Sequence, residues 1–142
     1  MSGRGAVVVD TNVFSARLSP QRAALAERYE PMLVGRPAII SFQTYAEVLH
    51  GALRAGWGPQ RRRRVQAALD AVETIWSGPE LAQAYAAFRV RCEEVGHALG
   101  QRVHDGDRWI AATAVHLGVP VVTHDGVFRD APGLLVETQL TA

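Results

Sequence analysis

The chain has 142 residues, of which 48% are hydrophobic and 20% charged, with 15 basic against 14 acidic residues and a net charge of +1. This length and composition predict a single globular domain over 1–142. No apolar run is long enough for a membrane span, and no signal-type segment opens the chain, so we expect a cytoplasmic protein with no membrane partner. The one cysteine, Cys92, excludes an internal disulfide and a cysteine-based zinc site.

The predicted elements alternate between strands and helices along the chain. Short apolar runs predict buried strands at 6–10, 37–40, 74–76, 119–125 and 134–136. Stretches with helical periodicity predict helices at 21–30, 42–55, 60–74, 81–99 and 107–117. Thr11 opens a further turn or helix, Pro31 closes the first long helix, Ser41 caps the next, and Gly100 and Gly118 end the last two. This alternation predicts an α/β fold with a central, mostly parallel sheet flanked by helices.

The helix predicted at 42–55 has two distinguishable faces. Its apolar positions predict a face directed toward the core, made of Phe42, Tyr45, Ala46, Leu49 and Leu53. An adjacent face carries Glu47, His50, Gly51 and Arg54.

Four acids occupy unusual places relative to these elements. Asp10 and Asp125 end apolar strands, whereas Glu47 and Asp107 lie in early turns of helices that begin at the same edge of the sheet. Asp107 also shares a helix face with the apolar residues that follow it, so it is directed inward. We therefore expect the four carboxylates to converge on one spot.

Convergent carboxylates repel one another and raise one another's pKa, so such a cluster favours a hard divalent cation. Mg²⁺ and Mn²⁺ take oxygen ligands, and they are typically held by carboxylates together with substrate phosphates. A site of this kind suits phosphodiester hydrolysis by a metal-activated water. The chain has no Gly-x-Ser-x-Gly motif and no glycine-rich phosphate loop that would indicate other chemistry.

Two other uses of such acids are disfavoured by the sequence. Glu47-x-x-His50 and Glu94-x-x-His97 match the paired motifs of di-iron helix bundles, but the valine-rich runs at 7–9 and 119–122 predict strands. A phosphorylated receiver domain would need a lysine beside its site, and all fifteen basic residues are arginine. A phosphatase of the Asp-x-Asp type would need an acid where Asn12 stands.

These same residues resemble the PIN-domain family, and in particular the VapC-type toxins of bacterial toxin–antitoxin pairs. The resemblance covers nearly the whole chain, in the segments 8–12, 41–48, 107–114 and 121–125, followed by Phe128 and 132–134. It implies a metal-dependent endoribonuclease that cleaves cellular RNA with Mg²⁺ or Mn²⁺ as cofactor. The catalytic, metal-holding acids would be Asp10, Glu47, Asp107 and Asp125, with Thr11 and Thr123 as the hydroxyls that orient them.

The resemblance also implies partners. A cognate antitoxin would lay a peptide into the acidic groove and offer an arginine to it, and two copies of the chain would form a homodimer. The alternative is a PIN-fold module that binds RNA or protein without turnover. The presence of all four acids favours the enzyme.

Arginines occupy all positions from 61 to 64 at the start of the predicted helix 60–74. Only Arg61 and Arg64 share a face of that helix. The cluster is either a solvated helix start that forms ion pairs with nearby acids, or a contact of Arg61 and Arg64 with RNA phosphates. It is not part of the family pattern.

Overall fold

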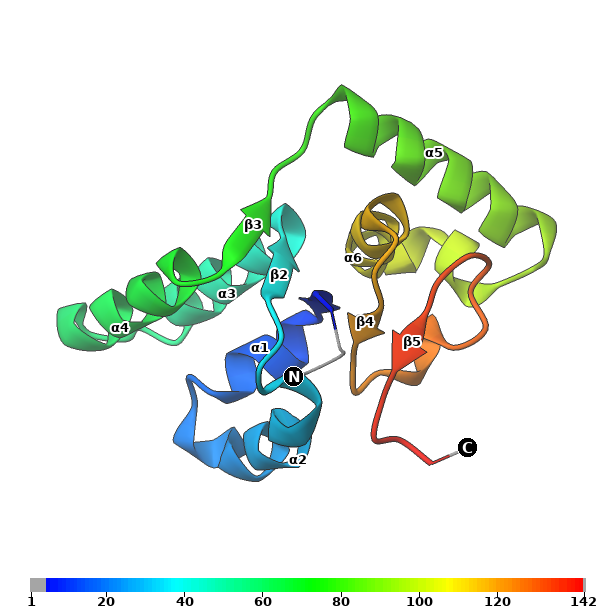
Figure 1. Ribbon diagram of the computed structural model, residues 1–142. Helices are drawn as coiled ribbons and strands as arrows, with labels where there is room; N and C mark the ends of the chain where they lie inside the picture. Colours follow the sequence, from blue (N-terminus) through cyan, green and yellow to red (C-terminus); the bar gives the residue numbers. More distant parts are fainter. Residues whose placement is uncertain (1–4, 142) are drawn as a thin grey trace.

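The computed structural model describes residues 5–141 and is built around a five-stranded sheet (Figure 1). The strand order is β3-β2-β1-β4-β5, and every neighbouring pair is parallel. The strands are β1 (Val7–Val9), β2 (Ala38–Ser41), β3 (Glu73–Ile75), β4 (Val121–Val122) and β5 (Val136–Glu137). The predicted α/β fold with a parallel sheet flanked by helices is confirmed.

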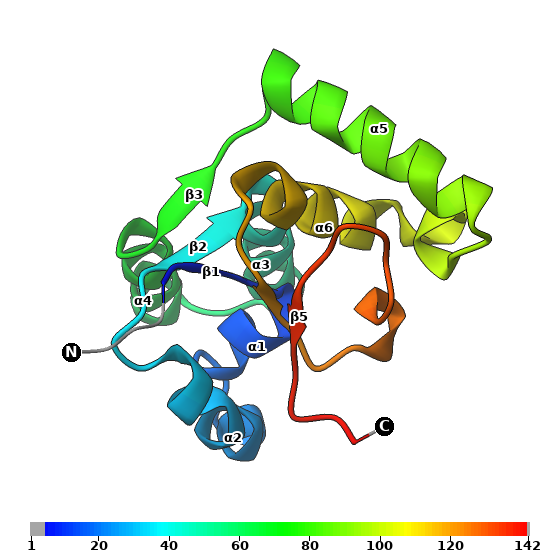
Figure 2. The same cartoon turned by 45° about the vertical axis from the view of Figure 1, so that its right-hand side comes forward.

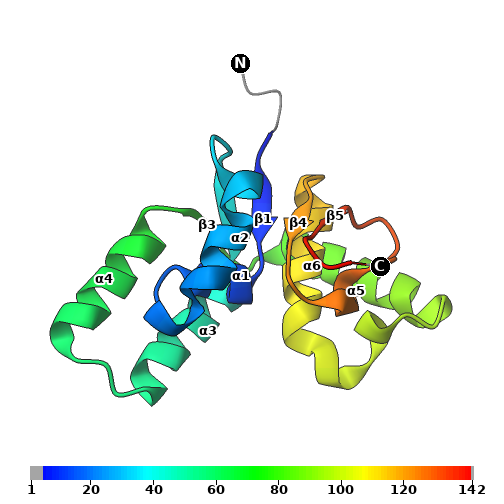
Figure 3. The same ribbon diagram turned by 90° about the horizontal axis from the view of Figure 1, so that it is seen from below.

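Helices cover both faces of this sheet. They are α1 (Thr11–Ala16), α2 (Ala23–Leu33), α3 (Phe42–Arg54), α4 (Pro59–Asp70), α5 (Pro79–Glu94) and α6 (Asp105–Leu117). Short 3₁₀ turns lie at Pro20–Arg22, Ala98–Gly100, Arg102–His104 and Gly126–Phe128. Figure 3 shows α1 to α4 on one side of β1 and α5 and α6 on the other. Within residues 5–141, no helix combines the length and the apolar character that crossing a bilayer requires.

The pleat of the strands sorts the core into two layers. Val8 and its neighbours face α5 and α6, in a layer that includes Ile39, Phe88, Ile110 and Val121. The alternate strand positions face α1 to α4, in a layer that includes Val7, Val9, Phe14, Tyr29, Ile40, Leu69 and Val122. Both faces of β1 are therefore buried, which explains why its sequence is an unbroken valine run rather than an alternating one.

Three predicted helix ends are wrong. Helix α2 continues through Pro31 to Leu33, because the proline removes only one hydrogen bond, in the final exposed turn. Helix α5 ends at Glu94 and not before Gly100, because Gly96 adopts a φ of 70° and the amide of His97 donates to the carbonyl of Cys92. Helix α4 ends at Asp70 because residues 73–75 pair with β2 instead.

The buried face of α3 also differs from the predicted one. Its fully buried residues are Thr44, Val48 and Ala52, whereas Leu53 is 65% exposed. Ser41 caps the helix as expected, since its hydroxyl accepts from the amides of Gln43 and Thr44. Helix α3 therefore packs through residues smaller than the predicted ones, and Thr44 among them lies with its hydroxyl 2.9 Å from that of Thr11 on α1.

A buried arginine holds the segment before α6 in place. Arg108 is 1% exposed and donates to the backbone carbonyls of Leu99, at 2.7 Å, and Gln101, at 2.8 Å. It also donates to the hydroxyl of Tyr85 and pairs with the carboxylate of Asp105, each at 3.0 Å. Figure 2 shows α5, which carries Tyr85, lying across α6. Arg108 thus fixes the first turn of α6 against α5 and the 98–104 turns.

We expect Arg108→Met to lower the free energy of unfolding by about 3 kcal/mol, because it leaves buried carbonyl groups without a donor. The matched control is Arg89→Met, whose arginine forms an exposed pair with Glu93 at 3.3 Å and should cost less than about 1 kcal/mol. Urea unfolding of both variants measures the two losses. Equal losses would contradict a structural role for Arg108.

Candidate active site

Asp10 lies at the carboxyl end of the central strand and is only 3% exposed. Its amide donates to the carbonyl of Val122 on the neighbouring strand at 2.9 Å. Its carboxylate accepts from the amide of Thr11 at 2.8 Å and from the hydroxyl of Thr123 at 2.7 Å. Asp10 therefore caps α1, as a plain helix start would, but it is also tied across the sheet to the end of β4.

Burial dominates the electrostatics of Asp10. It raises the pKa of the carboxyl from 3.8 to about 6, against the hydrogen bonds from Thr123 and Thr11, which lower the pKa. The charges of Asp107 and Asp125 raise it further. A carboxylate that only capped a helix would have a lowered pKa, because the helix start favours negative charge. A buried acid with a raised pKa among other acids is typical of a functional site.

Asp107 lies in the first turn of α6 and is partly buried. Burial raises its pKa most, and the charge of Asp125 and then that of Glu47 raise it too. His104 lowers the pKa of Asp107, because its Nδ1 lies 3.5 Å from the Asp107 carboxylate. The residues Ile110, Ala111 and Ala114 on the same face are fully buried, which confirms that this face of α6 is directed inward.

Glu47 extends from α3, on the other side of the sheet, toward the first turn of α6 that carries Asp107. Its carboxylate accepts from the hydroxyl of Thr11 at 2.6 Å, and that hydroxyl lies 2.9 Å from the hydroxyl of Thr44. A methyl group at Gly106 would stand 3.7 Å from the Glu47 carboxylate. Glu47 therefore lies against the first turn of α6, next to Asp107. Thr11 contacts Asp10 through its amide and Glu47 through its side chain.

Asp125 follows β4 and begins the turn Gly126–Phe128. One of its carboxylate oxygens accepts from the amide of Val127 at 2.9 Å, and its own amide donates to the hydroxyl of Thr123 at 3.0 Å. It thus has the turn-forming role that its sequence context indicates. Its charge nevertheless raises the pKa of both Asp10 and Asp107, so it belongs to the same cluster.

The four acids share one electrostatic neighbourhood without forming a closed ion cage. Among residues 5–141, no three acidic, histidine or cysteine side chains already enclose a position for a metal. Mg²⁺ and Mn²⁺ do not need such a cage, because one or two carboxylates, waters and substrate phosphates hold them. The donors are all oxygens, which fits these ions, and Asp10 and Asp107 have the raised pKa values that a bound cation would relieve.

Some residues near the site were not found from the sequence. Thr44 is buried beside Thr11, and the only signal for it is its position one turn before Glu47 on the same helix face. His124, although adjacent to Asp125 in sequence, has its Nδ1 2.7 Å from the hydroxyl of Tyr29. Its position beside Asp125 in the sequence makes it a weak candidate, and in the structure its ring contacts Tyr29.

Comparisons with known proteins agree with this geometry. Residues 7–134 match the family model described as PIN domain. Ribonuclease VapC5 from Mycobacterium tuberculosis is 34% identical over 129 residues, which is 89% of this chain and 87% of the relative. Ribonuclease VapC1 from Haemophilus influenzae is 25% identical over 118 residues, covering 83% of this chain and 85% of the relative.

Solved structures show the same fold. VapBC-5 from Mycobacterium tuberculosis, described as a member of the VapBC family of toxin–antitoxin systems, superposes with a TM-score of 0.63 at 31% identity, over 94% of this chain and 96% of that one. VapBC2 from Rickettsia felis gives a TM-score of 0.75 at 20% identity, over 94% and 98%. The chain belongs to the PIN-domain family, and its similarity lies with the VapC-type members.

Proposed function

We propose that the chain is an endoribonuclease that depends on Mg²⁺ or Mn²⁺ and acts as the toxin of a toxin–antitoxin pair. The observation that carries the proposal is the buried Asp10 carboxyl, with its pKa raised to about 6, in the same cluster as Asp107 and Asp125. A protein gains nothing in stability from this arrangement without a cation. The names of the relatives, which are ribonucleases, support the choice of RNA as substrate.

The residues divide the work as follows. Asp10 and Asp107 hold the ion, and Glu47 and Asp125 complete the acidic site. When bound, the ion would activate a water molecule and neutralise charge on the attacked phosphate. The hydroxyl of Thr123 fixes one oxygen of Asp10, and Thr11 fixes both Asp10 and Glu47, so the carboxylates need little rearrangement.

The proposed reaction is an in-line hydrolysis. The water oxygen bonds to phosphorus as the bond from phosphorus to the 3′ oxygen breaks. The 3′ oxygen takes up a proton, so the products carry a 5′-phosphate and a 3′-hydroxyl.

The proposed partners are an antitoxin and a second copy of the chain. The description of the solved relative from Mycobacterium tuberculosis as part of a toxin–antitoxin system supports the antitoxin. An arginine that the antitoxin inserted among the acids would form charge-assisted hydrogen bonds and take the place of the cation. The alternative function is binding of RNA or protein without turnover. The cleavage experiment below distinguishes it from the proposed ribonuclease.

Asp10→Asn should slow RNA cleavage in the presence of Mn²⁺ by about a hundredfold or more. A bound ion stabilises the transition state by several kcal/mol, and each ~1.4 kcal/mol is a factor of ten in rate. The matched control is Asp130→Asn, at an exposed residue with a φ of 61°, a conformation that asparagine tolerates. Release of fragments from labelled RNA, with and without a chelator, measures the effect. Rates that stay at the chelator background for both Asp10→Asn and the wild type would favour the binding module, and equal rates above that background would remove Asp10 from the catalytic site.

Without divalent cations, Asp10 should make stability fall as the pH rises. The folded carboxyl has a pKa of about 6 and the unfolded one a pKa of 3.8, so the folded state binds more protons between these values. This contribution is complete below the unfolded pKa and is lost as the pH rises through the folded pKa. The free energy of unfolding of the wild type, relative to Asp10→Asn, should therefore decrease by roughly 2 kcal/mol between about pH 4 and pH 7.

Mn²⁺ should restore that loss, because it binds the ionised carboxylates and so stabilises the wild type most above about pH 6. Urea unfolding of both proteins across this pH range, with a chelator and then with Mn²⁺, tests both statements. Parallel pH profiles of the two proteins, or an equal gain from Mn²⁺ in both, would remove Asp10 from the cation site.

A further inference from the structure

A pocket of about 300 Å³ opens beside the acids, at the small end of the range for sites that take a small molecule. Thr11 and Glu47 of the acidic site form part of its lining. Its other walls mix polar and apolar residues from α1, the loop after α1, α3 and the loop before α4, among them Asn12, Arg22, Val48 and Trp57. Any molecule that fills this pocket also reaches Glu47, so its natural occupant is part of the substrate.

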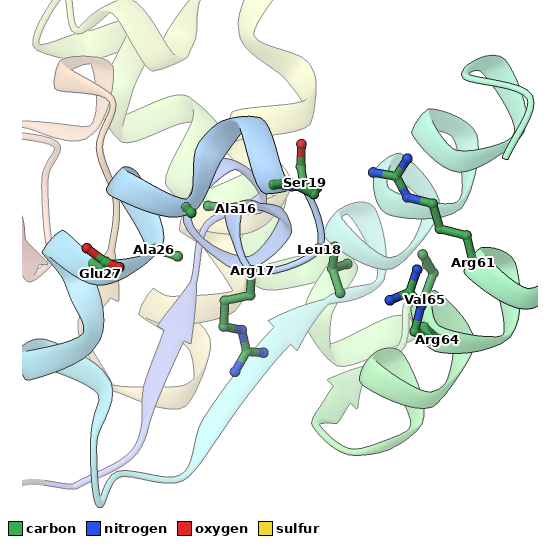
Figure 4. Close-up of a pocket in the computed structure, with 11 residues that line it drawn as sticks. Ala16, Arg17, Leu18, Ser19, Ala26, Glu27, Arg61, Arg64 and Val65 are labelled. Atoms are coloured by element: carbon green, nitrogen blue, oxygen red, sulfur yellow. The ribbon is translucent and has the colours of Figure 1, made fainter.

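A second groove, of about 580 Å³, adjoins this pocket. The two share Leu18 and Ser19 in their linings. The far wall of the groove is α4, from which Arg61 and Arg64 extend toward Leu18 and Ser19 (Figure 4). Leu18 and Ser19 thus lie between the pocket beside the acidic site and the arginine-bearing face of α4.

The arginines of this groove are not neutralised by carboxylates in the described part of the chain. Within residues 5–141, neither Arg61 nor Arg64 forms an ion pair with a carboxylate. Arg17 also lines the groove, against a single acid, Glu27. The interpretation of the arginine cluster as a helix start neutralised by nearby acids therefore does not describe Arg61 and Arg64.

Arg61 is held in a defined position by an aromatic ring. Its guanidinium carbon lies 3.5 Å from the centre of the Trp57 ring. Trp57 lines the first pocket and Arg61 the second, so this stacked pair stands where the two meet. A guanidinium held in this way loses less freedom when it binds a phosphate, and its planar donors match phosphate oxygens.

We propose that the RNA strand leaves the acidic site through the first pocket, which takes one nucleotide, and runs along the second groove with its phosphates on Arg61 and Arg64. This rests on the proposed ribonuclease function. Charge complementarity selects the occupant, because unpaired arginines beside a phosphodiester-cleaving site fit a polyanion. The apolar part of the groove, with Ala16, Ala26 and Val65, also offers a surface to a protein segment, which the experiment distinguishes.

The helix provides its own control. Arg62 and Arg63 have the same charge and the same local sequence, but they line a separate hollow with Leu49 and Leu53. The double variants Arg61→Gln/Arg64→Gln and Arg62→Gln/Arg63→Gln remove equal charge from one helix. A general loss of positive charge would affect both alike, whereas a defined RNA path would affect only the first.

The measurement is the salt dependence of RNA binding. A labelled single-stranded RNA of mixed sequence is titrated with each double variant in an Asp10→Asn background, at constant Mg²⁺ and rising monovalent salt. The slope of log affinity against log salt is negative, and each lost phosphate contact on a single strand makes it less steep by about 0.7. Arg61→Gln/Arg64→Gln should therefore make it less steep by about 1.4. Arg62→Gln/Arg63→Gln should leave the slope unchanged.

Equal slopes for the two double variants would overturn the proposed RNA path, and so would the absence of RNA binding by the Asp10→Asn chain. A third contradicting result is an unchanged RNA slope in Arg61→Gln/Arg64→Gln together with impaired binding of the antitoxin. The last would make the groove a protein-docking surface. Failure of the proposed function has a different signature. In that case the wild type would not cleave RNA with Mn²⁺, while the difference in slope between the double variants would persist and the RNA path would stand.

Discussion

The buried carboxylate of Asp10 is the constraint on which the site depends. The central strand places it at the carboxyl edge of the sheet, where its amide donates to the carbonyl of Val122. Its carboxylate oxygens accept from the amide of Thr11 and the hydroxyl of Thr123. It cannot turn toward water without breaking these bonds. Burial and the neighbouring acids therefore raise its pKa to about 6, a cost that the rest of the core must offset. A divalent cation bound among these acids would remove that cost, which would link the stability of the fold to the proposed activity.

The position of β1 in the middle of the sheet explains how distant segments meet. Glu47 comes from α3, in the core layer shared with α1, α2 and α4, and Asp107 comes from α6, in the opposite layer. The two layers meet where α3 contacts α6, near the carboxyl end of β1 that Asp10 follows. The groove lined by Arg61 and Arg64 is formed by α1, α2, α4 and the loop after α1, in the layer that does not contain α6. A strand bound there would not need to change the position of Asp107.

Much of the fold followed from the sequence because its signals are local. Valine runs located β1 and β4, and the acids that follow them were recognisable as misplaced charges. What the sequence left out depends on tertiary contacts. Thr44 and Arg108 are buried polar residues whose partners lie far along the chain or in irregular turns. Leu53 was assigned to the core by its pattern, but α3 packs through smaller residues and leaves it 65% exposed. The end of α5 at Glu94 could not be predicted without the backbone conformation of Gly96, whose φ is 70°.

The most direct test of the account is the location of a bound cation. Crystals soaked in Mn²⁺ and measured at a wavelength where manganese scatters anomalously would show it without reference to any activity. The account predicts a peak about 2.0–2.2 Å from carboxylate oxygens of Asp10 and Asp107, with Glu47 and Asp125 nearby. A peak elsewhere, or no peak at a Mn²⁺ concentration that supports RNA cleavage, would contradict the claim that these acids form one metal site.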